Sequence, residues 1–275
     1  MTEWRLIIGD GSPGSGALES DGGRNMAVDQ VLLDSVKAGG RPTLRFYRWK
    51  PACLSLGRNQ PARDRYDADG PTPGIHVVRR PTGGLAVFHD QELTYSVACR
   101  VGDLGSPRAT YLRVHRAIAA GLASLGAETA LSPRRASRAP VPADPAGVCF
   151  HSAAEGEVLA PAGKLVGSAQ RCEQRSILQH GSILLDGSQE RAGAAVVRKR
   201  AGAAPAAVAR VGGVATLTEL LGRRPAEAEL LSAIAAGFTA SMGIRLAPAW
   251  LAADEAGRLE AAEARYRSEN WTWRT

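Results

Sequence analysis

The order of strand-like and helix-like segments is the feature that most limits how this chain can fold. Its first part holds short β-rich stretches, with helical patterns at residues 25–36 and 111–125. Strand patterns return at 157–159, 164–169 and 176–185, after which the chain becomes mostly helical. Runs of strands separated and followed by helices are typical of an α+β domain rather than of alternating βαβ units. We therefore expect a mixed, mostly antiparallel sheet packed with helices.

The remaining elements follow from periodicity and from turn-forming residues. Strands are expected at residues 4–8, 43–49, 54–56, 75–79, 86–88, 93–99 and 244–246, and helices at 216–221, 226–242 and 249–266. With 275 residues and 44% hydrophobic content, the chain can bury a substantial core. We place one domain at residues 1–247, with its core at 38–247, and a C-terminal helical extension at 248–275.

Charge and cysteine content narrow the class of protein. The net charge is +7, but the longest basic cluster, residues 198–200, is too short to read as a nucleic-acid arm. No stretch of about 18 apolar residues is present, and the N-terminus lacks the pattern of a secretion signal. The four cysteines, Cys53, Cys99, Cys149 and Cys172, form no CxxC pair. We expect a cytoplasmic protein that binds neither nucleic acid nor a membrane.

One motif joins two arginines to a glycine turn. It reads Arg79-Arg80-Pro81-Thr82-Gly83-Gly84-Leu85-Ala86-Val87-Phe88-His89-Asp90. The arginines end a predicted strand, and the glycines permit close approach of backbone to a ligand. Exposed amides in such a turn can hold a carbonyl oxygen or a carboxylate. A plain hairpin with charged ends is the alternative.

A second motif places a lysine at the start of a strand of small residues. It reads Gly163-Lys164-Leu165-Val166-Gly167-Ser168-Ala169-Gln170. Only four of the 34 basic residues are lysines. Unlike arginine, lysine is a compact charge that can also lose its proton. Chance placement of the lysine is the alternative interpretation.

The third motif is Cys149-Phe150-His151, which follows a Pro/Ala/Arg-rich loop at residues 132–147. A thiol becomes nucleophilic as a thiolate, and a nearby cation lowers its pKa. His151 is one possible partner. A buried, inert thiol is the usual role of a cysteine, and we expect it for the three others. Zinc binding by Cys149, His151 and Cys172 lacks a recognised ligand spacing.

Together these segments resemble the family of lipoate–protein ligases and octanoyltransferases, which shares its catalytic domain with biotin ligases. The matching segments are Met26–Asp29, Leu44–Trp49 with Leu54–Gly57, Arg79–Ser96, Gly163–Gln170, Leu178–Ser182 and Tyr266–Trp271. The resemblance thus covers nearly the whole chain. It implies a biotin/lipoyl-ligase-like catalytic domain. The biotin-ligase branch with a repressor role is not favoured, because the chain begins directly with a strand.

Within this family the resemblance favours the octanoyltransferases that use a cysteine. It implies that Cys149 is the nucleophile and that Lys164 lowers the pKa of its thiol. Leu85 replaces a glycine that is usual in the ATP-dependent ligases. The residues expected to bind substrate are Arg79, Arg80, Thr82, Gly83, Gly84, His89, Gly167, Ser168, Ala169 and Gln170. No cofactor or metal is then required.

The implied reaction moves octanoate from acyl carrier protein onto Cys149 and then to a lysine of a lipoyl domain. The acceptor would be a protein such as the glycine cleavage H protein or a 2-oxoacid dehydrogenase E2 subunit. Two alternatives stay open within the family: an ATP- and magnesium-dependent lipoate ligase, and an amidotransferase acting between lipoyl domains. A basic nucleic-acid-binding module is the non-enzymatic alternative, with binding that weakens steeply in salt.

Overall fold

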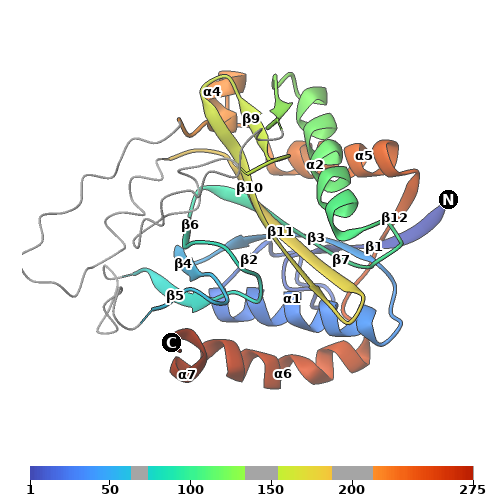
Figure 1. Cartoon of the computed structure of the whole chain (residues 1–275), viewed down its shortest axis with the longest axis vertical. Helices are drawn as coiled ribbons and strands as arrows, with labels where there is room; N and C mark the ends of the chain where they lie inside the picture. The colour runs from blue at the N-terminus through green and yellow to red at the C-terminus, as the bar shows by residue number, and fades with distance from the viewer. Residues whose placement is uncertain (63–73, 134–153, 188–212, 275) are drawn as a thin grey trace, which may run out of the picture.

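The computed structural model describes residues 1–62, 74–133, 154–187 and 213–274, and shows two sheets flanked by helices (Figure 1). The strands of the main sheet are β1 (Thr2–Ile8), β2 (Glu19–Ser20), β3 (Thr43–Trp49), β7 (Glu92–Arg100), β8 (Ala130–Leu131), β9 (Val158–Ala160), β10 (Gly163–Glu173), β11 (Ser176–Leu184) and β12 (Ile244–Pro248). A small sheet contains β4 (Cys53–Leu56), β5 (His76–Arg79) and β6 (Val87–His89).

The main sheet runs in the order β12-β1-β3-β7-β11-β10-β9-β8, with β2 beside β3. Strands β12, β1 and β3 are mutually parallel, and so are β2 and β3. From β3 onward each neighbour is antiparallel, and the longest ladders join β7, β11 and β10. This arrangement confirms the predicted α+β class with a mixed, mostly antiparallel sheet.

Helices cover both faces of the main sheet (Figure 1). They are α1 (Gly22–Lys37), α2 (Pro107–Ser124), α4 (Leu217–Leu221), α5 (Glu227–Met242), α6 (Ala253–Arg267) and α7 (Glu269–Thr272). On one face α2 packs on α5, and their core includes Val114, Ile118 and Phe238. On the other face α6 packs on α1. No helix in the described part of the chain is both long and apolar enough to cross a bilayer.

Three helix starts differ from the sequence predictions by three or four residues because of local capping and pairing. Helix α1 begins at Gly22 rather than at 25, since Asp21 accepts a hydrogen bond from Arg24 N. Helix α2 begins four residues before 111, since Ser106 accepts a hydrogen bond from Ala109 N and Pro107 occupies the first turn. Helix α6 begins at Ala253 rather than at 249. The residues before it continue beside β1 instead, with Ala249 N donating to Leu6 O at 2.9 Å.

Candidate functional site

A cleft lies where the two sheets meet. Strands β3, β7, β10 and β11 contribute to its walls, together with α1 and the small sheet. Its lining residues are Met26, Tyr47, Trp49, Ser55, Arg80, Val87, His89, Thr94, Gly167, Ser168, Ala169, His180, Gly181 and Ser182. A concave, largely apolar lining with a few polar groups is typical of small-molecule sites.

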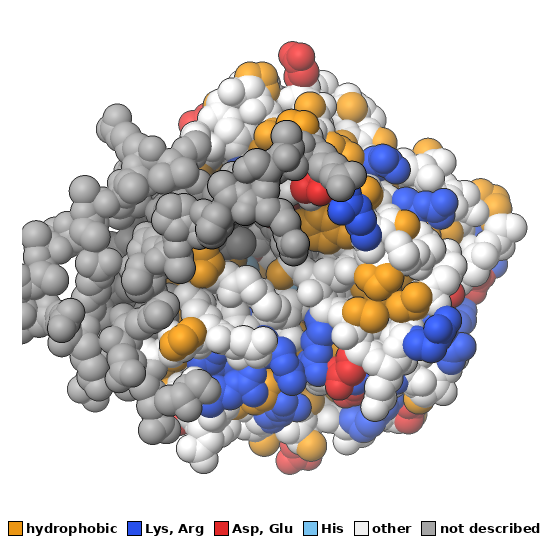
Figure 2. All heavy atoms as spheres, in the orientation of Figure 1, with side chains coloured by type: hydrophobic (Ala, Val, Ile, Leu, Met, Phe, Trp, Pro, Cys, Tyr) orange, Lys and Arg blue, Asp and Glu red, His pale blue; other side chains and the backbone are white. Residues whose placement is uncertain are grey.

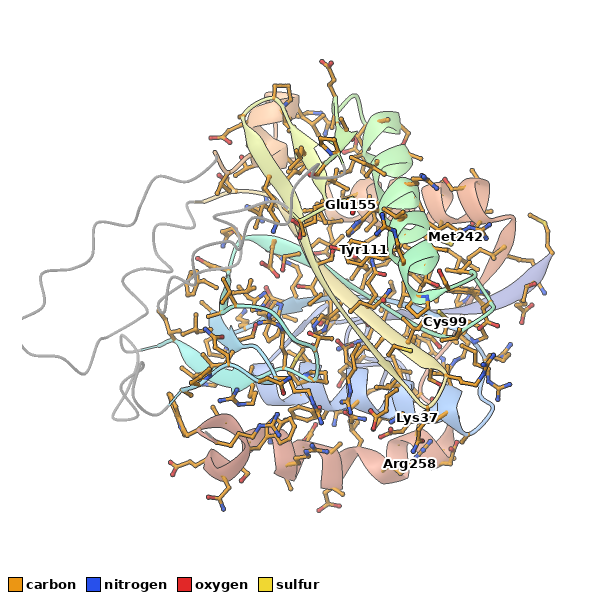
Figure 3. The ribbon with its side chains drawn as sticks, in the orientation of Figure 1. Lys37, Cys99, Tyr111, Glu155, Met242 and Arg258 are labelled. Carbon is orange, nitrogen blue, oxygen red and sulfur yellow. The ribbon has the colours of Figure 1, made fainter. Side chains whose placement is uncertain are left out.

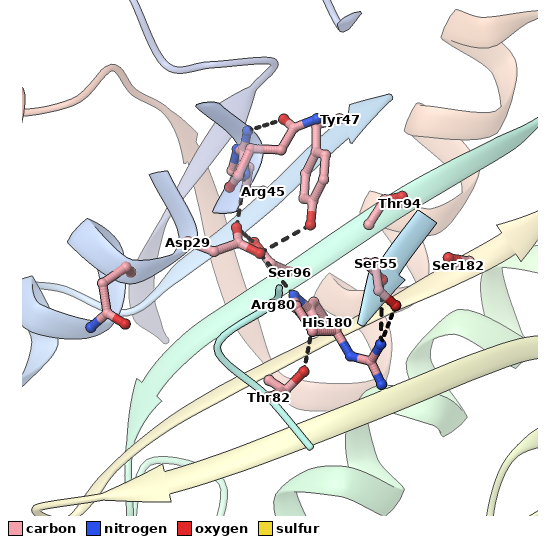
Figure 4. A network of polar contacts seen from close by, with 12 residues as sticks. Asp29, Arg45, Tyr47, Ser55, Arg80, Thr82, Thr94, Ser96, His180 and Ser182 are labelled. Atoms are coloured by element: carbon pink, nitrogen blue, oxygen red, sulfur yellow. Dashed lines mark hydrogen bonds and ion pairs between the residues drawn. The ribbon is translucent and has the colours of Figure 1, made fainter. Parts of the chain in front are cut away.

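A buried carboxylate organises one wall of the cleft (Figure 4). Asp29 of α1 accepts hydrogen bonds from Arg45 Nη1 at 2.8 Å and from Tyr47 Oη at 3.0 Å on β3. It also accepts from Ser96 Oγ at 2.8 Å and His180 Nδ1 at 2.9 Å. Asp29 and Arg45 are fully buried, and their pairing compensates the loss of hydration. This carboxylate thereby ties α1, β3, β7 and β11 together.

The protonation of this network follows from its contacts. Burial alone would raise the pKa of Asp29, but the hydrogen bond from His180 and the charge of Arg45 outweigh it and lower that pKa. Burial lowers the pKa of His180, against the attraction of Asp29. A neutral His180 that donates from Nδ1 has its Nε2 free to accept from Thr82 Oγ1, 2.6 Å away. Thr82 is thus held at the cleft wall through His180.

A second polar cluster surrounds His89, which is stacked on Trp49 with ring centroids 4.0 Å apart. His89 Nδ1 donates to Glu92 Oε1 at 2.8 Å, and His89 Nε2 lies 2.7 Å from Ser55 Oγ. The same Glu92 oxygen accepts from Thr94 Oγ1 at 2.6 Å. These contacts fix the orientation of the imidazole and the indole that line the cleft.

The two arginines of the first motif occupy different places. Arg80 lines the cleft, where its guanidinium donates to the carbonyls of Ser55, Gly83 and Leu85 at 2.6–3.0 Å. Arg79 is fully buried and is not among the residues that line the cleft. Its guanidinium donates to main-chain carbonyls on two sides: Gly57, Arg58 and Gln60 on one, and Trp271, Thr272 and Arg274 on the other. Arg79 therefore joins the loop after β4 to the C-terminal segment.

The glycine turn packs tightly against this loop. Gly84 has a φ of +94°, a conformation that favours glycine. A Cβ built on Gly57 would lie 1.8 Å from the Gly84 carbonyl oxygen, so Gly57 permits the contact between loop and turn. Gly83 and Gly84 are not lining residues of the cleft itself. The ligand-holding role predicted for their amides stays a prediction.

Lys164 is buried against a carboxylate that the sequence analysis did not single out. Its Nζ lies 2.9 Å from Glu157 Oε2, and the side chains of both residues are at most 3% exposed. Glu157 also accepts from Ala154 N at 2.6 Å and, through Oε1, from Ser168 N at 3.4 Å. The ion pair is thereby linked to the residues of β10 that line the cleft. An acidic residue in a short strand pattern was the available signal for Glu157.

A chain of hydrogen bonds runs behind Ser168. Tyr95 Oη and His115 Nε2 lie 2.7 and 2.8 Å from Ser168 Oγ, and Gln179 Nε2 donates to Tyr95 Oη at 3.1 Å. His115 Nδ1 donates to the carbonyl of Gly156 at 2.7 Å. Burial is the main cause that lowers the pKa of His115, to about 4. A neutral His115 accepts the Ser168 hydroxyl hydrogen and orients that hydroxyl at the cleft.

The other residues predicted for the site divide as follows. Gly167 and Ala169 line the cleft with Ser168 on β10. Gln170 points to the side, where its Nε2 donates to the Pro107 carbonyl and to Gln179 Oε1. Tyr111, which projects from α2, packs edge-on against His115 (Figure 3). The predicted nucleophile Cys149, with Phe150 and His151, lies outside the described residues.

The other three cysteines differ in exposure. Cys53 and Cys99 are fully buried, as predicted. Burial is the main cause that raises the pKa of both thiols, that of Cys99 to about 12. For Cys172 the prediction of a buried thiol is wrong: it is exposed near the β10–β11 turn. The zinc alternative involves two residues outside the described ranges.

Sequence comparison relates this chain to a known family. The model of the lipoyl protein ligase A/B catalytic domain matches residues 21–239. The chain belongs to this family. It is 38% identical to octanoyltransferase LipM of Symbiobacterium thermophilum, over 99% of each chain. It is 36% identical to octanoyltransferase LipM of Kyrpidia tusciae over the full length of both.

Solved structures of the family share the fold. A bipartite lipoate protein ligase from Thermoplasma acidophilum superposes with a TM-score of 0.76 at 22% identity, covering 99% of this chain and 97% of that one. A lipoate-protein ligase A bound with ATP gives 0.75 at 22% identity, with 99% of each chain covered. The catalytic-domain fold expected from the sequence is therefore confirmed.

Proposed function

We propose that this chain is an octanoyltransferase of lipoate biosynthesis that carries the octanoyl group on Cys149. The observation that carries the proposal is end-to-end similarity, at 36–38% identity, to proteins named octanoyltransferase LipM. The position of Lys164 supports it, because the family resemblance assigns this residue to the activation of the cysteine. The reaction then belongs to the acyltransferases.

The cleft supports an acyl substrate. Met26, Val87 and Trp49 give it apolar surface, while the polar groups of its walls are paired with one another. Each buried methylene contributes roughly 0.8 kcal/mol, so the six methylenes of an octanoyl chain would contribute roughly 5 kcal/mol. The lining thus offers apolar contacts to an octanoyl chain, and this part of the affinity requires no charged contact.

The first step loads the enzyme. The Cys149 thiolate attacks the carbonyl carbon of an octanoyl thioester, a new C–S bond forms, and the donor leaves as its own thiolate. A charged Lys164 favours the thiolate form of Cys149. Glu157 holds the Lys164 ammonium in place. The buried pair thus fixes the position of the cation while lowering the net charge around it.

The second step transfers the chain. The neutral amine of a lipoyl-domain lysine attacks the thioester carbonyl, an amide bond forms, and Cys149 leaves as a thiolate while the amine loses a proton. A covalent intermediate lets the two protein substrates bind in turn. The donor in this scheme is octanoyl acyl carrier protein. The acceptor is a lipoyl domain such as that of the glycine cleavage H protein or a 2-oxoacid dehydrogenase E2 subunit.

Intact-mass spectrometry tests the proposal. The enzyme is mixed with octanoyl acyl carrier protein without ATP or added metal, and the adduct is mapped by peptide digestion. We expect a mass increase of one octanoyl group on Cys149. Adding a lipoyl domain should discharge the adduct and octanoylate the domain. The Cys149→Ala variant should show neither event, whereas Cys172→Ala, which removes an exposed thiol, should behave as wild type.

The other outcomes are equally informative. Octanoylation of the lipoyl domain that requires ATP and survives Cys149→Ala would overturn the proposal in favour of a ligase. Loading from an octanoylated lipoyl domain, with no loading from the carrier protein, would assign the chain to the amidotransferases.

A further inference from the structure

A cluster of arginines lies outside the cleft and has no role in the chemistry proposed above. We define the arginine patch as Arg58, Arg171, Arg265 and Arg274. Three of its guanidinium groups surround Trp271: the Cζ atoms of Arg265, Arg274 and Arg58 lie 3.8, 3.9 and 5.7 Å from the ring centroid. Figure 2 shows Lys and Arg side chains gathered in the lower part of this face, in the region of α1, α6 and α7.

The positive charge of this patch is poorly compensated. In the described ranges, no carboxylate forms an ion pair with Arg58, Arg265 or Arg274, and only Arg171 is paired, with Glu173. The pKa of Arg58 is lowered first by burial and then by the charge of Arg171. Burial and the neighbouring arginines act on the pKa of Arg274 in the same way. Like charges held this close repel one another, so a negatively charged partner would be stabilised here.

One donor in the patch is left unsatisfied. Arg58 Nη1 is buried without a hydrogen-bond partner among the described residues, a state that costs about 1–3 kcal/mol or more for a charged group. Trp271, on which the arginines rest, is itself anchored by its Nε1 hydrogen bond of 2.9 Å to the Arg79 carbonyl. The indole is therefore fixed. Arg274 Nη2 donates to the carbonyl of Arg58, so this contact holds two members of the patch together but supplies no negative charge.

The patch is joined to the cleft by short connections. Arg58 N donates to the Thr82 carbonyl at 2.8 Å, and Thr82 contacts the cleft residue His180. Arg171 lies on β10, three residues beyond Ser168. None of the four arginines lines the cleft. A partner bound at the patch must therefore deliver its acyl group to the cleft on an extended arm.

From this placement we propose that the arginine patch docks the acidic surface of the carrier protein that donates the acyl chain. This inference rests on the proposed function. A carrier protein presents its thioester on a long, flexible prosthetic arm, which suits a docking site beside the cleft rather than in it. A lipoyl domain presents its acceptor on a single lysine side chain and must come closer. Charge complementarity of this kind raises the association rate and selects the partner.

Charge reversal tests the docking surface. The double variant Arg58→Glu/Arg265→Glu removes two side chains that make no ion pair in the described structure. The matched control is Arg116→Glu, an exposed arginine of α2 on the other side of the sheet. We expect kcat/KM for loading from octanoyl acyl carrier protein to fall at least tenfold in the double variant, with a flatter salt dependence. The neutral Arg58→Gln/Arg265→Gln variant should lie between.

Small donors and single half-reactions separate the possible explanations. Loading from octanoyl-pantetheine, which has neither the protein nor a phosphate, should stay within twofold of wild type. An equal loss with this donor, or no loss with the carrier protein, would overturn the proposal. A loss with octanoyl-coenzyme A as large as that with the carrier would assign the patch to phosphate binding instead.

Failures of the two proposals can be told apart. Slower discharge of preloaded enzyme by the lipoyl domain, with unchanged loading, would assign the patch to the acceptor and overturn carrier docking. If wild-type enzyme loads from no octanoyl donor, the proposed function itself fails.

Discussion

Arg79 provides a quantitative test of how the C-terminal segment is held. In Arg79→Lys a single ammonium replaces a guanidinium that spans two groups of carbonyl oxygens. Four of its bonds, to Gly57, Gln60, Thr272 and Arg274, measure 3.0 Å or less. A lysine can serve one side at a time, so two to three bonds are lost. At about 1.5 kcal/mol each for a charged donor, the free energy of unfolding should fall by about 3–5 kcal/mol.

Two measurements check this prediction. Urea denaturation gives the change in the free energy of unfolding. Hydrogen exchange reports on the α7 amides, which are protected by bonds such as Thr272 N to Ser268 O at 3.0 Å. Both stability and protection should drop, and exchange in α2 should be less affected. The exposed Arg245→Lys is a neutral control.

The sequence motif predicts that Arg79 binds substrate. The experiment therefore distinguishes this role from a structural one. If Arg79 binds substrate, its replacement should raise KM while stability and α7 exchange stay at wild-type values. That outcome would refute the clamp between loop and C-terminus.

Three further predictions address the buried polar groups and the cleft. Because the pKa of His115 is lowered from 6.5 to about 4, the unfolded state binds more protons than the folded state below pH 6.5. The free energy of unfolding should therefore fall by about 3 kcal/mol between pH 6.5 and 4. Urea titrations should show a smaller loss in His115→Gln but not in the exposed His76→Gln. Asp29→Asn leaves the buried Arg45 charge uncompensated and should cost about 3–5 kcal/mol in chemical denaturation; a cost below 1 kcal/mol would contradict the network. In Gly181→Ala a Cβ would lie 2.2 Å from Ser168 Oγ, so we expect about 1–3 kcal/mol of strain and at least tenfold slower octanoyl loading; wild-type loading would show that Ser168 can move without consequence.

The sequence predicted the elements better than their connections. Strand-forming residues bounded by turn residues located β3, β7 and β11, although these strands are buried on both faces and so show little alternation. The start of α2 was missed because Ser106 and Pro107 carry no helical periodicity, only capping and first-turn preferences. The two-residue strands β2 and β8 are too short for a pattern to show.

Part of the lining of the candidate cleft was predicted. Motifs marked Arg80, His89 and Ser168, which the structure places in one cleft. Glu157 and His115 were not predicted. The Glu157–Lys164 pair depends on how the antiparallel strands β9 and β10 align, and His115 contacts Ser168 across 53 residues of sequence. A single sequence does not reveal such pairs. The predicted role of Cys149 depends on the family resemblance and awaits the labelling experiment.

The Asp29 network has a consequence for synthesis on the ribosome. Asp29 and Arg45 leave the exit tunnel long before His180, and β7 lacks its neighbour β11 until residue 184 has been translated. Until then Asp29 lacks its contact with His180 on β11. The charged side chains of Asp29 and Arg45 therefore stay hydrated. Loop closure over such separations is slow. The nascent chain should therefore acquire protease resistance only after β11 has emerged, which ribosome-stalled chains of graded length can reveal.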